Sequence, residues 1–138
     1  MPSSRFSPEI NRLRAVLRGH SGPELITTLA SEIEPWPVAA LVADNGQRYV
    51  ASNAAARELT GYTQSEFNGL TVTDLTPSPT ADDGQQLWEE FIGRGGQRGE
   101  YDIAPKRGGL IRVRYWAFAG LAPGLHISLL VPTEPELA

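Results

Sequence analysis

The chain has 138 residues, of which 41% are hydrophobic and 20% are charged, and these proportions are typical of one globular domain with a single core. Its 12 basic and 16 acidic residues give a formal net charge of −4, and no basic run exceeds Lys106-Arg107, so we expect no direct binding to nucleic acid. The sequence contains no cysteine, which excludes disulfides, thiolate nucleophiles, iron–sulfur clusters and cysteine-based zinc sites.

Two amphipathic helices are predicted within residues 7–34. Ser7 and Pro8 form a typical helix start, and Pro23 begins a second helix after a glycine-flanked break. The apolar faces comprise Ile10, Leu13 and Leu17 in the first helix and Leu25, Ile26 and Leu29 in the second. Because so few residues cannot form a core of their own, we predict an extension over residues 1–35, a domain over 36–132 and a tail or linker over 133–138.

A β-hairpin followed by short helices is predicted over residues 38–69. Asn45-Gly46 separates two apolar runs and is the dipeptide preferred in a type I′ turn, where both residues have positive φ. Ser52 or Asn53 then caps a helix that ends at Gly61, and a second short helix ends before Gly69.

One long helix and three strands complete the predicted elements. The helix carries an apolar stripe, and strands follow at about residues 97–105, 109–120 and 124–131, separated by glycine-containing turns. The stripe consists of Leu87, Trp88, Phe91 and Ile92. Hairpins at both ends of the chain with helices between them indicate an α+β fold built on one antiparallel sheet.

The ordered series of elements from Val38 onward resembles the PAS superfamily. The series consists of an apolar strand ending in Asp44, the Asn-Gly turn, a second strand, Asn53-Ala54-Ala55 opening a helix that runs to Leu59-Thr60-Gly61-Tyr62, and Ser65-Glu66-Phe67-Asn68-Gly69-Leu70. With the long helix and the last three strands, the resemblance spans about residues 36–132. It implies a five-stranded antiparallel sheet with short helices and one long helix on one face, an internal pocket in many members, and a role in signalling.

The resemblance leaves the identity of any cofactor open, but the residues that this chain lacks exclude some of the cofactors that PAS relatives bind. PAS relatives that form a flavin–cysteinyl adduct or a thioester-linked chromophore need a thiol, which this chain lacks. Haem-binding relatives commonly use a histidine on the long helix, and residues 80–94 contain none, so we do not expect haem there.

Alternation along the strand at 109–120 separates two faces. Ile111, Val113, Tyr115 and Ala117 are assigned to the interior of the domain. A pocket for a small, largely apolar ligand is predicted there, lined by Phe67, Leu87, Phe91, Val113, Tyr115 and Ile127. The alternative, a fully packed core in a ligand-free interaction domain, stays open.

The opposite face of the same strand carries Arg112, Arg114, Trp116 and Phe118. Trp116 and Phe118 would form an exposed apolar patch unless something covers them. The N-terminal helices are the nearest cover, either within one chain as a cap or across a homodimer, and we favour the homodimer because two helices offer more apolar surface than one sheet face needs.

No catalytic or metal site is predicted. His126 is expected on the outer face of the last strand and His20 in a solvated loop, without metal-binding spacing. Asp44, Glu66 and Asp74 fall at turn or helix boundaries, where capping explains them. We therefore predict a sensory module without enzymatic activity; a small pocketed enzyme, such as an isomerase or hydratase, would need an ionisable group inside the sheet.

The location and the route of the signal follow from the two ends of the chain. No apolar run approaches the roughly 20 residues of a membrane helix, and arginines interrupt the first 20 residues, so we expect a cytoplasmic protein that does not bind membranes. Pro132 and Pro135 oppose a continuous C-terminal helix, which favours output through the N-terminal helices. The expected partners are a second copy of the chain, a small ligand, and a downstream signalling protein or fused output domain.

Overall fold

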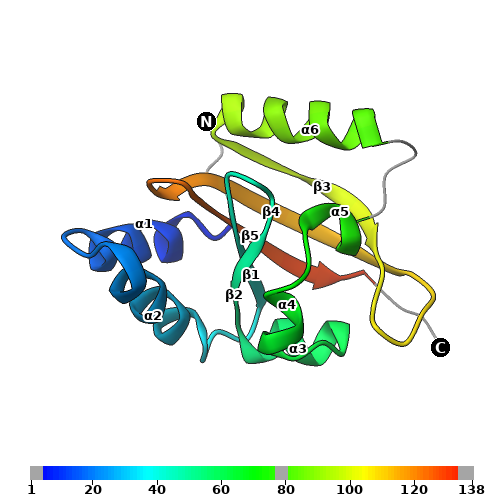
Figure 1. The fold of residues 1–138 in the computed structure, drawn as a ribbon, viewed down its shortest axis with the longest axis horizontal. Helices are drawn as coiled ribbons and strands as arrows, with labels where there is room; N and C mark the ends of the chain where they lie inside the picture. The colour runs from blue at the N-terminus through cyan, green and yellow to red at the C-terminus, as the bar shows by residue number, and fades with distance from the viewer. Residues whose placement is uncertain (1–4, 77–80, 134–138) are drawn as a thin grey trace.

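The computed structural model describes residues 5–76 and 81–133, with side chains from residue 86 onward in the second range. These residues form six helices and five strands (Figure 1). The helices are α1 (Ser7–Leu17), α2 (Gly22–Ile33), α3 (Ala54–Thr60), α4 (Gln64–Phe67), α5 (Val72–Leu75) and α6 (Ala81–Arg94). The strands are β1 (Ala39–Asp44), β2 (Tyr49–Ser52), β3 (Gly96–Ile103), β4 (Ile111–Ala122) and β5 (Leu125–Pro132).

The five strands form one antiparallel sheet in the order β2-β1-β5-β4-β3. The predicted α+β fold with a five-stranded antiparallel sheet is therefore confirmed. The first and last strand blocks meet in the middle of the sheet, where β1 pairs with β5 from Ala39–Leu130 to Asp44–Leu125.

The sheet separates two hydrophobic clusters. The inner face, which carries Val113, Tyr115 and Ala117, packs with buried residues of α3, α4, α5 and α6. The outer face packs against α1 and α2, which Figure 1 shows together on one side of the sheet, away from α6. Each face thus has its own helical layer, and the single sheet lies between them.

The N-terminal helices belong to the core of this chain. Ile10 is 1% exposed and Leu29 is not exposed at all, and both lie in the outer cluster with Leu13, Leu17 and Leu25. Phe6 contacts Trp116 edge to face, with ring centroids 5.1 Å apart. Ile26 and Phe118 are partly buried against the same cluster. The surface predicted as a dimer or cap contact is thus covered within one chain, which is the cap arrangement.

The outer face remains charged where the helices do not cover it. Glu100 and Asp102 on β3 form ion pairs with Arg112 and Arg114 on β4, and all four side chains are substantially exposed. Along β4 the outward residues therefore change from arginine to Trp116 and Phe118, and this change marks where the cover begins.

The turn between β1 and β2 differs from the type I′ prediction. Gln47 has a positive φ of 66°, whereas Asn45 and Gly46 do not have positive φ values. The Asp44 carboxylate accepts hydrogen bonds from the amides of Gly46 and Arg48, at 2.8 and 3.0 Å. This side chain stabilises a three-residue turn ending in a left-handed residue, which is the other common way to close a hairpin.

Side-chain caps set the limits of the short helices. Asn53 caps α3, which ends at Gly61 with a φ of 83°, as predicted. Thr63 with Glu66 and Thr71 with Asp74 form capping boxes at the starts of α4 and α5, so the two acidic residues cap helices as predicted. Helix α5 has only four residues and was not predicted. No helix in the described part of the chain combines the length and the apolar character needed to span a membrane.

Candidate functional site

A cavity of about 260 Å³ lies between the inner face of the sheet and helices α5 and α6. All five strands contribute to its wall. The lining residues are Leu41, Ala43, Gln47, Tyr49, Val72, Thr73, Thr76, Leu87, Trp88, Phe91, Gln97, Tyr101, Tyr115, Ala117, His126 and Ser128. Ala43 and Ala117 leave space over the middle of the sheet because their side chains are only methyl groups. Leu87 is 52% exposed, so the cavity wall reaches the surface at α6.

The six residues predicted to line a pocket fall into three groups. Leu87, Phe91 and Tyr115 line the cavity. Phe67 and Val113 are fully buried in the inner cluster and pack beside the cavity without lining it. Ile127 lies in the outer cluster beneath the N-terminal helices, so its assignment to the interior differs from the structure.

His126 and Ile127 each lie on the opposite face of β5 from the one predicted, and the strand register explains why. Ala117 is paired with Ser128 and Phe118 with Ile127, so Ser128 shares the inner face and Ile127 shares the outer face. His126 therefore lies on the inner side and lines the cavity, not on the outer face as expected. Both faces of β5 are buried, so hydrophobicity alone does not distinguish them.

Aromatic rings form two parts of the cavity wall. Tyr101 and Tyr115 stack in parallel, with centroids 4.2 Å apart and an interplanar angle of 7°. Across the cavity, Trp88 and Phe91 of α6 contact the His126 ring edge to face, at 5.6 and 6.0 Å. These rings make two walls that are apolar in area and polar only at their edges.

Gly99 makes the tyrosine wall possible. It pairs with Tyr115 across β3 and β4, and a Cβ at this position would lie 3.3 Å from Cε1 of the Tyr115 ring. A side chain there would push the ring away from β3. The sequence signal is a glycine within a strand, which often marks a close approach.

Two tyrosine hydroxyls at the cavity have an unused hydrogen-bond donor. The Gln97 amide donates to the Tyr115 hydroxyl at 2.6 Å, which leaves the Tyr115 proton available because an amide NH₂ can only donate. Tyr49 is 6% exposed, and its hydroxyl has no hydrogen-bond partner among the described residues. Tyr101 differs, because burial raises the pKa of its hydroxyl and the neighbouring Ser128 side chain opposes that shift.

Burial holds the phenols of Tyr49 and Tyr101 in their neutral form. Burial raises the pKa of Tyr49 well above its usual value, with the charges of Tyr101 and Asp74 adding to the effect. Burial likewise raises the pKa of Tyr101, with a further contribution from Tyr115. Neutral phenols donate hydrogen bonds, so the cavity offers donors and not phenolate charges.

Both ring nitrogens of His126 are hydrogen-bonded. The Gly120 amide donates to Nδ1 at 2.9 Å, and Nε2 lies 2.7 Å from Oδ1 of Asn45. Because an amide N–H can only donate, Nδ1 carries no proton, and Nε2–H donates to Asn45. Burial lowers the His126 pKa, although the charge of Asp44 opposes the shift. His126 is therefore neutral at pH 7 and joins the β1–β2 turn to β4.

The described lining residues include no aspartate, glutamate, lysine or arginine. In the described ranges, 5–76 and 81–133, no group of three histidine or acidic side chains is placed to hold a metal ion. The site can therefore contact a ligand through rings, methyl groups and neutral hydrogen bonds.

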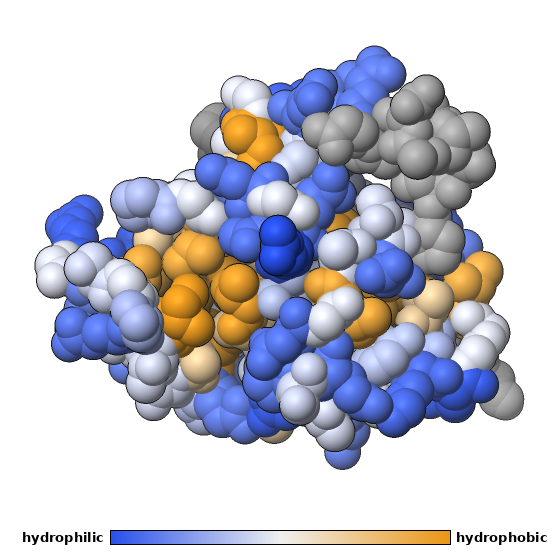
Figure 2. Space-filling model, viewed as in Figure 1, coloured by the Kyte–Doolittle hydropathy of each residue, from blue (hydrophilic) through white to orange (hydrophobic). Residues whose placement is uncertain are grey.

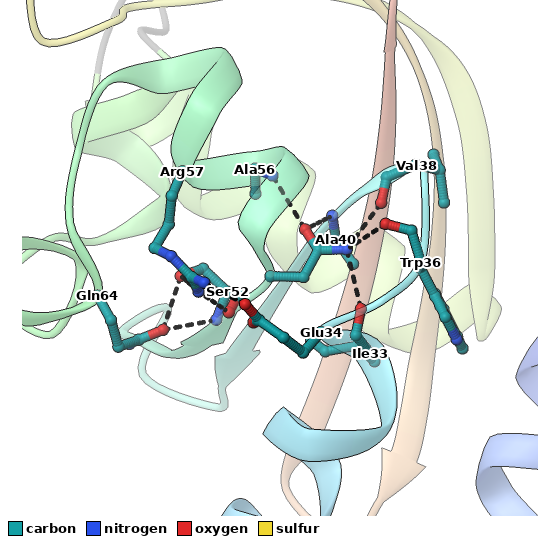
Figure 3. A network of polar contacts seen from close by, with 10 residues as sticks. Ile33, Glu34, Trp36, Val38, Ala40, Ser52, Ala56, Arg57 and Gln64 are labelled. Carbon is teal, nitrogen blue, oxygen red and sulfur yellow. Dashed lines mark hydrogen bonds and ion pairs between the residues drawn. The ribbon is translucent and has the colours of Figure 1, made fainter.

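A buried asparagine connects the end of α2 to the sheet and to α3 (Figure 3). Asn53 is fully buried between the end of α2, the start of β1 and the start of α3. Its Oδ1 accepts from the amides of Ala40 and Ala56, both at 2.9 Å. Its Nδ2 donates to the carbonyls of Ile33, Trp36 and Val38, at 3.1, 3.4 and 2.8 Å.

A second set of polar contacts lies beside Asn53 (Figure 3). Arg57 of α3 donates to the Ser52 carbonyl at 2.6 Å and forms an ion pair with Glu34, the residue after α2. The Ser52 amide and hydroxyl both donate to Oε1 of Gln64, at 2.9 and 2.6 Å. Helices α2, α3 and α4 are thus attached to the same end of β2.

The sheet itself is the shortest connection between the cavity and α1–α2. On β1, Leu41 and Ala43 line the cavity, whereas Ala40 and Val42 belong to the outer cluster. Tyr115 and Trp116 show the same alternation on β4, facing the cavity and Phe6 respectively. A strand displaced by cavity contents would therefore also move the surface on which α1 and α2 pack.

Several site residues were absent from the sequence analysis. Tyr49, Gln97 and Tyr101 lie on short or edge strands, where no long alternating pattern marks the inward side. Asn53 was expected only to cap a helix. Its contacts with α2 join residues up to 20 positions apart in the sequence, and no local pattern indicates contacts over that distance. The signal that would have identified Asn53 is its place in a run of residues expected to be buried, because a buried polar side chain needs hydrogen-bond partners.

Comparisons with known proteins extend these observations. A family model described as the PAS fold matches residues 33–109, more than half of the chain. Comparison with curated protein sequences gives no match.

Among solved structures, a domain of a sensory box sensor histidine kinase/response regulator from Geobacter sulfurreducens is 21% identical, with a TM-score of 0.63 over 72% of this chain and 87% of that chain. A PAS domain from a two-component sensor histidine kinase is 12% identical, with a TM-score of 0.64 over 78% of this chain and 95% of that chain. The Rhodobacter sphaeroides LOV protein is 13% identical, with a TM-score of 0.61 over 91% of this chain and 67% of that chain.

The strand order, the helices on the inner face and the match to the family model agree with one another. The chain belongs to the PAS family.

Proposed function

We propose that this protein is a cytoplasmic signal-sensing module that binds a small ligand in its cavity and passes a conformational signal to its N-terminal helices. The observation that carries the proposal is the position of the sheet, one strand thick, between the cavity and the α1–α2 layer. A ligand that binds one packing of this layer better than another shifts the population toward it.

We propose a binding module and not an enzyme. The lining residues in the described ranges include no acidic side chain, and both nitrogens of His126 are engaged by Gly120 and Asn45. Catalysis in the cavity would require a general base within reach of a bound substrate.

The proposed output is a downstream signalling protein or a fused output domain. Two of the similar domains come from sensor histidine kinases, and this supports the proposal. The N-terminal helices are the proposed route, since Asn53 and Arg57 attach the end of α2 to the sheet and α3.

A homodimer formed through α1 and α2 is also proposed. Most of the predicted contact residues are covered within the chain. The dimer would use side chains that stay accessible, namely Val16, which is 39% exposed, and the partly buried Ile26. Figure 2 shows apolar surface between α2 and the β1–β2 hairpin. Sedimentation should give a dimer for the native chain and a monomer for Val16→Glu/Ile26→Glu; a native monomer contradicts this part.

Native mass spectrometry before and after denaturation tests ligand binding. We expect the freshly purified protein to carry a small molecule that denaturation releases, and Ala117→Phe, which fills the cavity, to carry none. Ala54→Phe adds the same side chain at an exposed position and should retain the molecule. Equal occupancy in the native and Ala117→Phe proteins would place the ligand outside the cavity.

A further inference from the structure

Tyr49 and Tyr115 are two polar residues of the cavity whose hydroxyl groups each have a hydrogen-bond donor left over. They are 6% and 8% exposed, and both line the cavity. The Tyr115 hydroxyl accepts from Gln97 and retains its own proton, and the Tyr49 hydroxyl has no partner among the described residues. Buried polar groups are nearly always hydrogen-bonded, so these two donors are available to a ligand acceptor that displaces water from the cavity.

The remaining wall determines what else the ligand must be. Six of the sixteen lining side chains are rings, namely Tyr49, Trp88, Phe91, Tyr101, Tyr115 and His126. Rings bind other rings by offset stacking and edge-to-face contact, which favours a flat aromatic molecule over a branched aliphatic one.

Charge selects against ionised ligands. A carboxylate or phosphate is normally held by arginine or lysine, and a cationic amine by an acidic group. The described lining residues include none of these, and His126 is held neutral by the Gly120 amide that donates to Nδ1. An ion in this cavity would lose its hydration without a compensating partner.

Size sets the last condition. The cavity volume of about 260 Å³ is below the roughly 300–1,000 Å³ of clefts that hold drug-sized ligands. One or two fused rings fit this volume better than an extended cofactor does.

We propose that the cavity binds an uncharged aromatic molecule of one or two fused rings whose carbonyl oxygen or ring nitrogen accepts hydrogen bonds from Tyr49 and Tyr115. This inference rests on the proposed function, because it names the ligand class for the same cavity.

Three bicyclic probes test the inference by titration of the intact chain, followed through its backbone amide resonances. Coumarin is flat and uncharged and has a carbonyl acceptor. Naphthalene lacks the acceptor, and coumarin-3-carboxylate adds a negative charge. We expect coumarin to bind most tightly and the carboxylate at least about tenfold more weakly, because its charge is buried unpaired.

Tyrosine variants test the donors while keeping the rings. Tyr49→Phe and Tyr115→Phe should each weaken coumarin binding about three- to tenfold, the range that one net hydrogen bond produces, and leave naphthalene unchanged. Tyr101→Phe is the matched control, because it also removes a cavity hydroxyl, and Ser128 lies close enough to the Tyr101 hydroxyl to affect its pKa. It should alter coumarin binding less than either of the other two variants.

The outcomes separate the two proposals. If all three probes bind with similar affinity, or if both donor variants bind coumarin normally, the ligand class is wrong while a ligand-binding cavity remains. If none of the probes shifts the resonances of cavity residues, the ligand class is wrong, and the proposed sensing function fails as well only if native mass spectrometry finds no bound small molecule.

Discussion

Asn53 shows how one side chain serves two elements at once. Its oxygen caps α3, and its amide nitrogen donates to three carbonyls in and after α2. An aspartate at this position keeps the acceptor and loses the donors, so the two roles can be tested separately.

Asn53→Asp should therefore lower the free energy of unfolding by about 2 kcal/mol or more, because buried carbonyls lose their donor and face a carboxylate. Thr63→Ala removes the cap of α4 and leaves the α2 carbonyls bonded to Asn53, so it should cost only about 1 kcal/mol. Urea unfolding followed by circular dichroism measures both values. Equal losses in the two variants would reduce Asn53 to an ordinary helix cap.

His126 makes the stability of the fold depend on pH. Folding lowers its pKa, so the unfolded chain binds the proton more readily. This contribution to stability is complete above the unfolded value of about 6.5 and is lost as the pH falls through the folded value. Protonation would also place a second proton between Nδ1 and the Gly120 amide.

We expect the free energy of unfolding to fall between pH 7.5 and pH 5.5, by at most about 1.4 kcal/mol for each unit of pKa difference at His126. His126→Asn retains an acceptor near Gly120 and cannot take up the proton, so its pH dependence over this interval should be smaller. Urea titrations at both pH values make the comparison. Identical slopes for the two proteins would show that His126 does not contribute.

At the level of elements, α1 and α2 behave as a layer of the domain. Leu29 is fully buried in the outer cluster, whereas Val16 on α1 is 39% exposed. Leu29→Ala should cost about 2–5 kcal/mol in unfolding free energy, since it opens a cavity beneath the sheet. Val16→Ala should cost less than about 1 kcal/mol. A small loss for Leu29→Ala would mean that the helices detach easily from the sheet in solution.

Element order was more predictable from the sequence than the faces of the strands. The α3 cap at Asn53 and the stop at Gly61 follow from local residue chemistry, and both were predicted. On β4, arginines on one side of the strand separated the faces correctly. On β5 the apolar residues cover both faces, because α1 and α2 bury the outer one, and so His126 and Ile127 were exchanged.

The cavity depends on relations that no local pattern contains. Tyr49 and Tyr115 lie 66 positions apart in the sequence, and only the sheet brings them to one wall. The cavity has room because Ala43 and Ala117 have small side chains, and nothing in the sequence distinguishes these two from other small residues of a strand. The resemblance to PAS proteins implied an interior pocket, and the structure identifies the residues that line it.

At the level of the whole molecule, we propose that the contents of the cavity alter the packing of α1 and α2 through the sheet. Leu41 and Ala43 line the cavity on one side of β1, and Ala40 and Val42 contact the outer cluster on the other. Coupling of this kind requires that the two sites share an element with two packings.

Amide hydrogen exchange in α1 and α2 tests the claim most directly, with the native chain, Ala117→Phe and Ala54→Phe compared after circular dichroism shows that all three fold. We predict that filling the cavity in Ala117→Phe changes exchange rates in α2 at least about threefold, whereas the exposed Ala54→Phe leaves them unchanged. Changes in Ala117→Phe that stay on the inner face and do not reach α1 or α2 would contradict the account.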